Sequence, residues 1–317
     1  MTKKDLRIVF MGTPEFAVAS LKTLNEGGYN IVGVVTMPDK PANRGHKLQF
    51  SAVKEYALAN DLPLLQPEKF KSPEFLQQLA AWKADLQIVI AFRMLPEVVW
   101  NMPPKGTFNL HASLLPAYRG AAPINWAIIN GEKETGVTTF FLSDEIDTGD
   151  VIFREKIDIH SNDTAGTVHD SLMLLGASLV TKTVDAILSE NIQPVPQANT
   201  TEELLKSAPK ITKETCKINW TKTGREIHNL VRGLSPYPTA WTELVTADGE
   251  VISLKIYETE FICEKHSFPL CAIKTDEKTY MKVAVSDGFV RLNALQLPSR
   301  KRMNIADLLH GFRITED

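Results

Sequence analysis

The stretch Leu6-Arg7-Ile8-Val9-Phe10-Met11-Gly12-Thr13-Pro14-Glu15-Phe16 decides the fold class, because its pattern is that of a strand, a turn and a helix start. The apolar run over residues 6–10 has the length of a buried strand. Gly12 then marks a turn, and Pro14 stands where proline is favoured, at the first turn of a helix. A strand that turns directly into a helix is typical of an α/β domain with a mostly parallel sheet.

The same order of strand and helix repeats through about residue 190. We expect strands over residues 6–10, 31–36, 86–92, 106–111, 136–142 and 151–159, and helices over residues 16–26, 51–60, 73–83, 123–130 and 167–189. For the helix over 73–83, Ser72 is the expected N-cap, with Pro73 at the first helical position. The alternation predicts a Rossmann-like sheet with right-handed crossovers.

After this region the pattern changes. Residues 191–201 lose periodicity and contain two prolines, which indicates a linker. A helix is expected over residues 223–233, followed by short alternating runs over 240–245, 251–260, 271–274, 281–284 and 289–296. Short strands at turn-marked intervals predict a small OB-like β-barrel. The expected organisation is therefore a domain over residues 1–190, a linker over 191–206 and a second domain over 207–317.

The composition is that of an ordinary globular protein. Of the 317 residues, 44% are hydrophobic and 23% are charged, and the length predicts about two domains. No uninterrupted apolar run approaches the roughly 18 residues of a membrane span, so we expect no membrane association. The amino terminus resembles a first strand rather than a signal sequence. Cys216, Cys263 and Cys271 lack metal-ligand spacing, which indicates reduced thiols in a cytoplasmic protein.

Charge is distributed unevenly along the chain. From residue 206 onward, 17 Lys and Arg stand against 14 Asp and Glu, a net charge of +3. The preceding residues hold 18 against 24, a net charge of −6, so the whole chain carries −3. A difference this small usually reflects a solvated surface and is weak evidence for a nucleic-acid partner.

Polar residues are placed on two of the expected strands where apolar ones would be buried. In Phe108-Asn109-Leu110-His111, the side chains of Asn109 and His111 share one face of a strand and Leu110 takes the other. Further on, Asp147-Thr148-Gly149-Asp150 favours a tight loop at a strand end. Each motif alone is more often structural. Together, Asn109, His111 and Asp147 can polarise a carbonyl, stabilise an oxyanion and move a proton. None of the three is a typical acyl-transfer nucleophile, so they indicate direct transfer of an acyl group.

Two loops offer anion-binding chemistry. Gly12-Thr13-Pro14 at a helix start could hold a phosphate or carboxylate, but it is not the Gly-x-Gly-x-x-Gly of dinucleotide-binding proteins. The polar stretch from Met37 to Leu48 carries Lys40, Arg44 and Lys47 with few apolar residues. Such a stretch is most often a solvated loop; the alternative is a basic finger that contacts phosphates.

These residues and motifs resemble the methionyl-tRNA branch of the folate-dependent formyltransferase family over nearly the whole chain. The matching segments are Phe10-Met11-Gly12-Thr13-Pro14-Glu15-Phe16, Pro38-Asp39-Lys40-Pro41, Asn109 to Pro116, Arg119-Gly120-Ala121-Ala122-Pro123, Asp147 to Asp150, Arg232-Gly233-Leu234-Ser235-Pro236-Tyr237-Pro238 and Lys301-Arg302-Met303. All members of the family share the Asn-His-Asp set, which therefore identifies the chemistry and not the acceptor. The Arg119–Pro123 segment and the second domain point to the tRNA branch.

The resemblance implies a reaction and a set of site residues. The α-amine of initiator methionyl-tRNA would attack the formyl carbon of 10-formyltetrahydrofolate, the co-substrate, with no metal and no covalent enzyme intermediate. Asn109 and His111 would donate hydrogen bonds to the carbonyl oxygen, and Asp147 would orient His111 and help to remove the amine proton. The implied folate-binding residues are Phe92, Arg93, Leu95, Ser113, Leu114, Leu115, Pro116, Asp144 and Asp150. The implied tRNA-binding residues are Lys40, Arg44, Lys47, Arg232, Lys301 and Arg302.

The sequence departs from the family at one place: Phe92-Arg93-Met94 stands after Ala91, where members have Tyr-Gly before Leu-Pro. Arg93 fits at a glycine position if its φ is negative and its side chain points outward. Alternative acceptors within the same chemistry are an amino sugar or a nucleotide amine. A nucleotide-dependent reductase would lack its fingerprint here, and a non-catalytic RNA-binding module would leave Asn109, His111 and Asp147 without a role. No obligate protein partner is implied.

Overall fold

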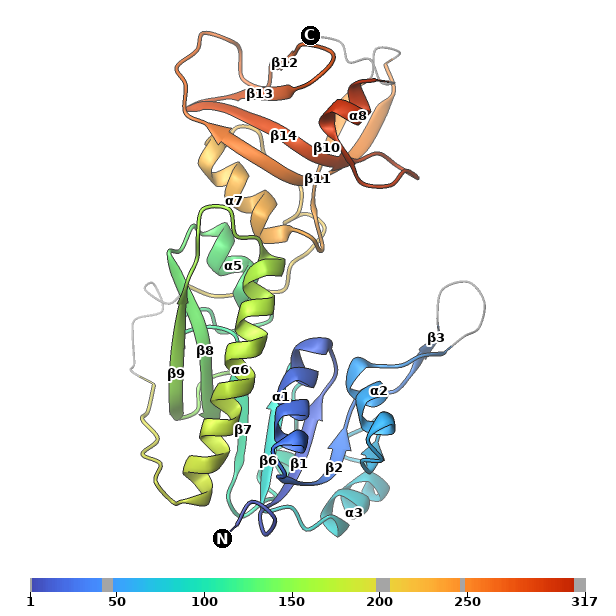
Figure 1. The fold of residues 1–317 in the computed structure, drawn as a ribbon, viewed down its shortest axis with the longest axis vertical. Coiled ribbons are helices and arrows are strands. Elements are labelled where there is room, and N and C mark those ends of the chain that lie inside the picture. The colour runs from blue at the N-terminus through green and yellow to red at the C-terminus, as the bar shows by residue number, and fades with distance from the viewer. Residues whose placement is uncertain (1, 42–47, 198–205, 246–248, 311–317) are drawn as a thin grey trace. The chain divides into compact units, whose positions relative to one another are not determined.

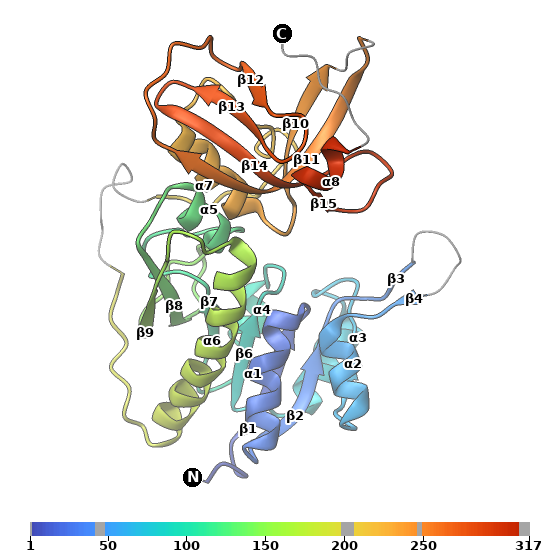
Figure 2. The same cartoon turned by 45° about the horizontal axis from the view of Figure 1, so that its top comes forward.

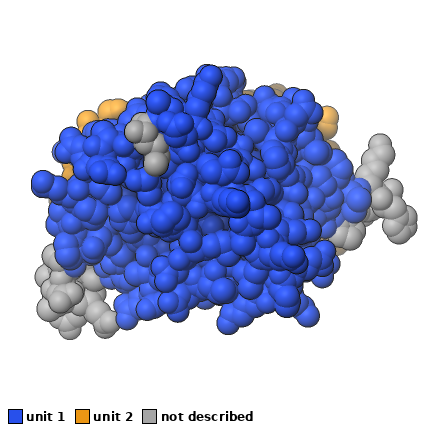
Figure 3. Space-filling view, turned by 90° about the horizontal axis from the view of Figure 1, so that it is seen from below, with its two compact units in different colours: residues 1–120, 135–157, 169–206 blue, residues 121–134, 158–168, 207–317 orange. Residues whose placement is uncertain are grey.

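The computed structural model describes residues 2–41, 48–197, 206–245 and 249–310, and the chain divides into two compact units (Figures 1 and 3). The first unit consists of residues 1–120, 135–157 and 169–206, and the second of residues 121–134, 158–168 and 207–317. The segments 121–134 and 158–168, which belong to the second unit, were not apparent from the sequence. The domain division expected at residues 191–206 stays a prediction.

The first unit is built on a seven-stranded sheet in the order β5-β2-β1-β6-β7-β8-β9. Its strands are β1 (Arg7–Gly12), β2 (Asn30–Val35), β5 (Leu64–Leu65), β6 (Leu86–Ile90), β7 (Thr107–His111), β8 (Glu134–Phe141) and β9 (Val151–Asp158). The strands from β5 to β7 pair in parallel, whereas β8 runs antiparallel to β7. The Rossmann-like prediction is therefore confirmed. The order of the parallel strands reverses between β1 and β6, and ligands of such sheets bind at the carboxyl ends of the strands near this point.

Helices cover both faces of this sheet. They are α1 (Glu15–Glu26), α2 (Ala52–Ala59), α3 (Pro73–Ala81), α4 (Glu97–Trp100) and α6 (Ala165–Leu188), whose first residues belong to the second unit. On one face, Val9 and Val89 pack with Phe75 and Leu79 of α3. On the other, Leu110 of β7 lies against Gly176 of α6. Ser72 caps α3 by accepting a hydrogen bond from the Phe75 N–H, with proline in the first turn, as the sequence predicted.

Helix α6 is long and apolar enough to cross a membrane by length and composition alone, although polar residues interrupt its apolar sequence. Val168, Leu172 and Val180 on this helix are buried. The Thr183 hydroxyl lies 2.9 Å from that of Thr139 on β8. These contacts make α6 a covering helix of the first unit's sheet (Figure 1).

The second unit contains an antiparallel sheet in the order β10-β11-β14-β13-β12, with β15 paired to β14 (Figure 2). The strands are β10 (Ala240–Val245), β11 (Val251–Ile262), β12 (Ile273–Thr275), β13 (Met281–Val285), β14 (Gly288–Gln296) and β15 (Met303–Asn304). Its helices are α5 (Pro123–Ile129), α7 (Gly224–Leu234) and α8 (Ile305–Leu309). Ile227, Val231 and Leu234 of α7 pack against Ile256 and Leu295 of the sheet. The five expected β runs are all present as strands, with ends displaced by up to two residues.

Sequence patterns missed the shortest elements. These are β3 (Lys40–Pro41), β4 (Leu48–Gln49), β5, α4, β15 and α8. Elements of two to five residues hold less than two turns of a helix or two side-chain alternations of a strand, so periodicity has nothing to repeat. All three cysteines are free, with Cys216 buried and Cys263 and Cys271 exposed.

Candidate active site

Strand β7 presents Asn109 and His111 on the face opposite Leu110, near the carboxyl end of the strand. His111 is 7% exposed. The Oδ1 atom of Asn109 is buried and has no hydrogen-bond partner among the described residues. Buried polar atoms are nearly always satisfied in folded proteins. An unsatisfied amide beside a buried histidine, at the ligand-binding edge of the sheet, therefore marks a site that a substrate would complete.

The ring of His111 is oriented by the main chain. Its Nε2 atom lies 2.8 Å from the Tyr118 carbonyl oxygen. Because a carbonyl oxygen only accepts, Nε2 must carry the hydrogen in this contact. The Nδ1 atom is then left for proton exchange or, in the imidazolium form, for donation to a substrate oxygen. Tyr118 has a φ of +61°, which is rare for a bulky residue and indicates a locally constrained loop.

Asp147 lies beside the free nitrogen of His111. Its Oδ2 atom is 3.8 Å from His111 Nδ1, and its side chain is 12% exposed. The same oxygen accepts a hydrogen bond from the Gly120 N–H at 3.0 Å. Asp147 also has a left-handed φ of +56°. The structure thus brings together Asn109, His111 and Asp147, and a carboxylate at this distance can stabilise a charged imidazole.

The segment after His111 is held by side chains from neighbouring strands. The Thr138 hydroxyl on β8 donates to the Ser113 carbonyl at 2.7 Å and accepts from the Leu115 N–H at 3.2 Å. Arg154 on β9 donates from Nε to the Leu115 carbonyl at 2.7 Å. Burial lowers the pKa of Arg154 from its ordinary value. The expected folate-binding residues Ser113, Leu114, Leu115 and Pro116 therefore form a braced turn next to His111.

The other expected folate-binding residues occupy two kinds of surroundings. Leu95 is buried in the core on one face of the sheet, and Phe92 packs against that core with its ring 5.7 Å from that of Phe70. Asp144 and Asp150 are exposed at the two ends of the loop that carries Asp147.

Arg93, the departure from the family pattern, is accommodated without a positive φ; the residue with positive φ in this stretch is Ala91, at +47°. The Arg93 guanidinium lies over the Phe70 ring at 4.0 Å and donates hydrogen bonds to the main-chain carbonyls of Pro67 and Glu68. Burial lowers its pKa from the ordinary value. Arg93 therefore ties the end of β6 to the segment before α3.

The expected tRNA-binding residues lie in different surroundings. Lys40 is exposed on β3, while Arg44 and Lys47 lie outside the described residues. Lys301 is exposed, and the exposed Arg302 pairs with Glu258 and lies over the Tyr257 ring at 4.8 Å. Arg232 is buried and donates to Asn229 Oδ1 and to the carbonyls of His160 and Asp163. Its guanidinium is thus already engaged with internal acceptors.

The base of the segment that carries Lys40 is fixed by a partly buried ion pair between Lys54 and Asp39. Asp39 accepts hydrogen bonds from Lys54 Nζ at 2.6 Å and from Gln66 Nε2 at 2.8 Å. These two bonds lower the pKa of Asp39 below its ordinary value.

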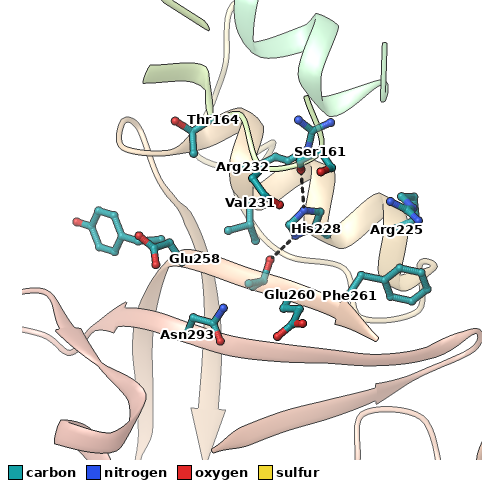
Figure 4. A pocket seen from close by; sticks show the side chains of 13 residues that line it. Ser161, Thr164, Arg225, His228, Val231, Arg232, Glu258, Glu260, Phe261 and Asn293 are labelled. Carbon is teal, nitrogen blue, oxygen red and sulfur yellow. Dashed lines mark hydrogen bonds between the residues drawn. The ribbon is translucent and has the colours of Figure 1, made fainter. Parts of the chain in front are cut away.

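A cavity of about 500 Å³ lies in the second unit between α7, β11 and residues 161–164 (Figure 4). Arg225, His228 and Arg232 of α7 contribute its basic side chains, and Glu258 and Glu260 its acidic ones. The imidazole of His228 lies 3.1 Å from the Thr259 hydroxyl and 3.5 Å from the Ser161 carbonyl oxygen. Burial is the largest influence on His228 and lowers its pKa, and the positive charges of Arg232 and Arg225 act in the same direction.

The lowered pKa of His228 predicts a pH dependence of stability. In the unfolded chain a histidine binds its proton at about pH 6.5, whereas the folded protein resists protonation until lower pH. The unfolded state then holds more protons, so the free energy of unfolding falls as the pH drops below about 6.5. Urea unfolding between pH 7.5 and 5 should show a steeper loss for the wild type than for His228→Asn. Equal slopes in the two proteins would contradict this assignment.

Three residues that support the His111–Asp147 site were not predicted from the sequence. Thr138 and Arg154 brace the turn after His111, and Gln197 bonds to the Asp147 loop. They act through main-chain carbonyls, so no motif signals them. Gln197 in particular lies in the stretch expected to be a linker.

Comparison with known proteins places this geometry in a family. The model for formyl transferases matches residues 6–184, and the model for the formyl transferase C-terminal domain matches residues 210–313. A methionyl-tRNA formyltransferase of Bacteroides thetaiotaomicron is 60% identical over 317 residues, covering 100% of this chain and 98% of that protein. One of Flavobacterium johnsoniae is 54% identical, covering 99% and 98%.

Solved structures share the fold at lower identity. The sugar 3N-formyl transferase WlaRD, solved with dTDP and 5-N-formyl-THF, has a TM-score of 0.66 at 22% identity, covering 93% of this chain and 99% of that one. HypX from Aquifex aeolicus in complex with tetrahydrofolic acid has a TM-score of 0.65 at 18% identity, covering 98% of this chain and 48% of that one. With both domain models matched and whole-length relatives of 54–60% identity, the chain belongs to the formyl transferase family.

Proposed function

We propose that this protein transfers the formyl group of 10-formyltetrahydrofolate to the α-amine of initiator methionyl-tRNA. The observation that carries the proposal is the 60% identity to a methionyl-tRNA formyltransferase over the whole of both chains, including the second unit. The site supports direct transfer, because Asn109, His111 and Asp147 supply hydrogen-bond donors and a carboxylate without a covalent nucleophile.

The reaction starts with attack of the amine nitrogen on the formyl carbon. In the imidazolium form, His111 donates from Nδ1 to the formyl oxygen as it gains negative charge, while Nε2 stays on the Tyr118 carbonyl. The Asn109 amide donates to the same oxygen; one such donor typically contributes about 10²–10³ in rate. Asp147 stabilises the imidazolium and accepts the proton that the amine loses. The bond from the formyl carbon to N10 of the folate then breaks, and N10 takes up the proton that Asp147 accepted, which returns Asp147 to its carboxylate form.

The folate is proposed to lie beside the braced turn of Ser113, Leu114, Leu115 and Pro116. Phe92, Arg93, Leu95, Asp144 and Asp150 would complete its surroundings. Support comes from a fold neighbour, HypX, whose structure was solved with tetrahydrofolic acid. No metal is assigned a role, because the three site residues cover both the charge and the proton demands.

The tRNA is proposed to contact exposed basic residues of both units. Lys40, Lys301 and Arg302 are exposed in the structure, and Arg44 and Lys47 are proposed from the sequence alone. Arg232 supports the tRNA surface indirectly, by fixing the segment of residues 160–163. Contacts of this kind weaken as salt rises, because each neutralised phosphate releases counterions. Because translation initiation takes place in the cytoplasm, we propose that the enzyme acts there and needs neither a membrane nor an obligate protein partner.

A competition assay tests the acceptor directly. With 10-formyltetrahydrofolate as donor, we expect rapid formylation of methionylated initiator tRNA, and at least about 100-fold slower transfer to an amino-sugar nucleotide or to glycinamide ribonucleotide. A binding site built for one amine acceptor rejects others that leave its polar groups unpaired, which accounts for discrimination of this size. If either small amine were formylated faster than methionyl-tRNA, the proposed acceptor would be wrong.

A further inference from the structure

Gln197 is buried in the first unit although it lies in a stretch with the sequence of a linker. Its residue is 9% exposed. Its Nε2 donates to the Asp147 carbonyl at 2.8 Å and to the Gly149 carbonyl at 2.9 Å. Its Oε1 accepts from Arg119 at 2.6 Å through Nη2 and at 3.2 Å through Nε. The amide therefore uses both of its donor hydrogens and both acceptor lone pairs.

Arg119, which donates to Gln197, is connected to the Asp147 carboxylate. Arg119 immediately precedes Gly120, whose N–H donates to Asp147 Oδ2 at 3.0 Å. Gln197 thus holds the main chain of Asp147 directly, and through Arg119 it holds the loop whose N–H binds the Asp147 side chain. One side chain connects the two loops that set the position of this carboxylate.

The Asp147 loop and the loop that contains Tyr118 and Arg119 each hold a residue with a positive φ. Asp147 and Tyr118 have φ values of +56° and +61°. Such conformations are unfavourable for residues other than glycine and persist only where surrounding contacts hold them. Gln197 holds Asp147, while the N–H of Tyr118 donates to the Lys206 carbonyl at 2.6 Å. Tyr118 in turn offers its carbonyl to His111 Nε2. Gln197 therefore fixes Asp147, and Lys206 fixes Tyr118, whose carbonyl binds His111.

We infer that Gln197 is a positioning residue for the His111–Asp147 pair, acting from the segment that leads to the second unit. The inference rests on the proposed function, in that His111 and Asp147 are taken as the reacting pair. Loss of the Gln197 amide frees the Asp147 loop and displaces the carboxylate from His111 Nδ1. A displacement of about 1 Å at a reacting group costs up to about 100-fold in rate.

Two substitutions separate the contacts of Gln197. Gln197→Leu removes all four hydrogen bonds while retaining similar volume. Gln197→Glu retains acceptance from Arg119 but sets a carboxylate oxygen against the carbonyls of Asp147 and Gly149, so only the contact to the Asp147 loop is lost. Gln87→Leu is the matched control: Gln87 is a fully buried glutamine on β6 whose Oε1 accepts from Thr107. It removes a buried glutamine amide from outside the site; the Nε2 of this amide has no hydrogen-bond partner among the described residues.

Single-turnover and steady-state formylation of methionyl-tRNA measure the effect. We expect Gln197→Leu and Gln197→Glu each to lower kcat by about 10- to 100-fold, with KM for both substrates changed less than about twofold. Gln87→Leu leaves kcat of the folded protein unchanged. An equal kcat for Gln197→Glu and the wild type would overturn the positioning role, and so would a kcat loss in Gln87→Leu as large as that in Gln197→Leu.

A measurement without substrates separates this inference from the proposed function. In protein labelled with ¹⁵N-histidine, the ring nitrogens of His111, assigned from the spectrum of His111→Ala, report the surroundings of Nδ1. Both Gln197 variants should shift the Nδ1 resonance, whereas Gln87→Leu should not. Unmoved His111 resonances in the folded Gln197 variants would overturn the inference even if transfer is observed. A wild type that transfers no formyl group to methionyl-tRNA would instead overturn the proposed function.

Discussion

Replacing His111 with alanine is expected to lower the rate of formyl transfer by at least about 10²–10³-fold, and Asn109→Ala by a similar factor. Each substitution removes one donor aimed at the oxygen on which charge develops, inside a site from which water is largely excluded. His111 is 7% exposed, so water cannot readily take over its role. Single-turnover rates at saturating folate and tRNA measure the effect on chemistry alone.

The fold of both variants should remain intact. His111→Ala removes the hydrogen bond that Nε2 donates to the Tyr118 carbonyl, which costs about 0.5–1.5 kcal/mol of unfolding free energy. A second histidine–carboxylate pair supplies the control: His169 Nδ1 lies 3.0 Å from Asp170 Oδ1, but both side chains are exposed. His169→Ala should transfer formyl at the wild-type rate. A rate within a few-fold of wild type in folded His111→Ala or Asn109→Ala would contradict the proposed chemistry.

Gly149→Ala is expected to lower transfer by at least about 100-fold and to destabilise the protein. A Cβ at Gly149 would lie 1.8 Å from the Phe141 carbonyl oxygen, so the main chain must move. The loop has little freedom to do so, because the Phe141 N–H donates to the Asp150 carbonyl at 2.9 Å on the other side. The displacement therefore reaches Asp147, two residues away. Crowding of this kind costs about 1–3 kcal/mol of stability, and a misplaced carboxylate costs up to about 10² in rate.

Gly28→Ala serves as the control for this glycine. Gly28 has a φ of +75° with nothing within 4 Å of an added Cβ, so alanine there suffers backbone strain without a clash. It should lose about 1–2 kcal/mol of unfolding free energy while keeping the wild-type rate. Urea unfolding and single-turnover transfer on both variants give the comparison. Transfer by Gly149→Ala at the rate of Gly28→Ala would show that the Asp147 loop tolerates displacement.

Much of the fold could be predicted from the sequence, because it depends on local periodicity. The parallel core follows from buried apolar strands such as β6, which alternate with helices whose starts are marked by residues such as Ser72 and Pro73. The sequence did not predict that residues 121–134 and 158–168 belong to the second unit. Assignment to a unit depends on packing between distant residues, which no local pattern records.

The part of the candidate site that depends on local spacing could also be predicted from the sequence. The two-residue spacing of Asn109 and His111 placed them on one strand face, and Thr148-Gly149 placed Asp147 in a turn. The tRNA-binding role of Arg232 stays a prediction from a motif, and the structure shows its guanidinium engaged with Asn229 and two main-chain carbonyls. A motif identifies the residue but not the acceptors that surround it.

The sequence by itself determined the order of the longer strands and helices, the common face of Asn109 and His111, and the family chemistry. Each of these depends on side-chain identity at short spacing. Only the tertiary structure decided that His111 Nε2 is bound to Tyr118, that Nδ1 faces Asp147, and that Gln197 holds the Asp147 loop. These contacts run to main-chain carbonyls and amides, which are the same in nearly every residue. No sequence motif distinguishes one carbonyl from another until folding brings it within hydrogen-bond distance.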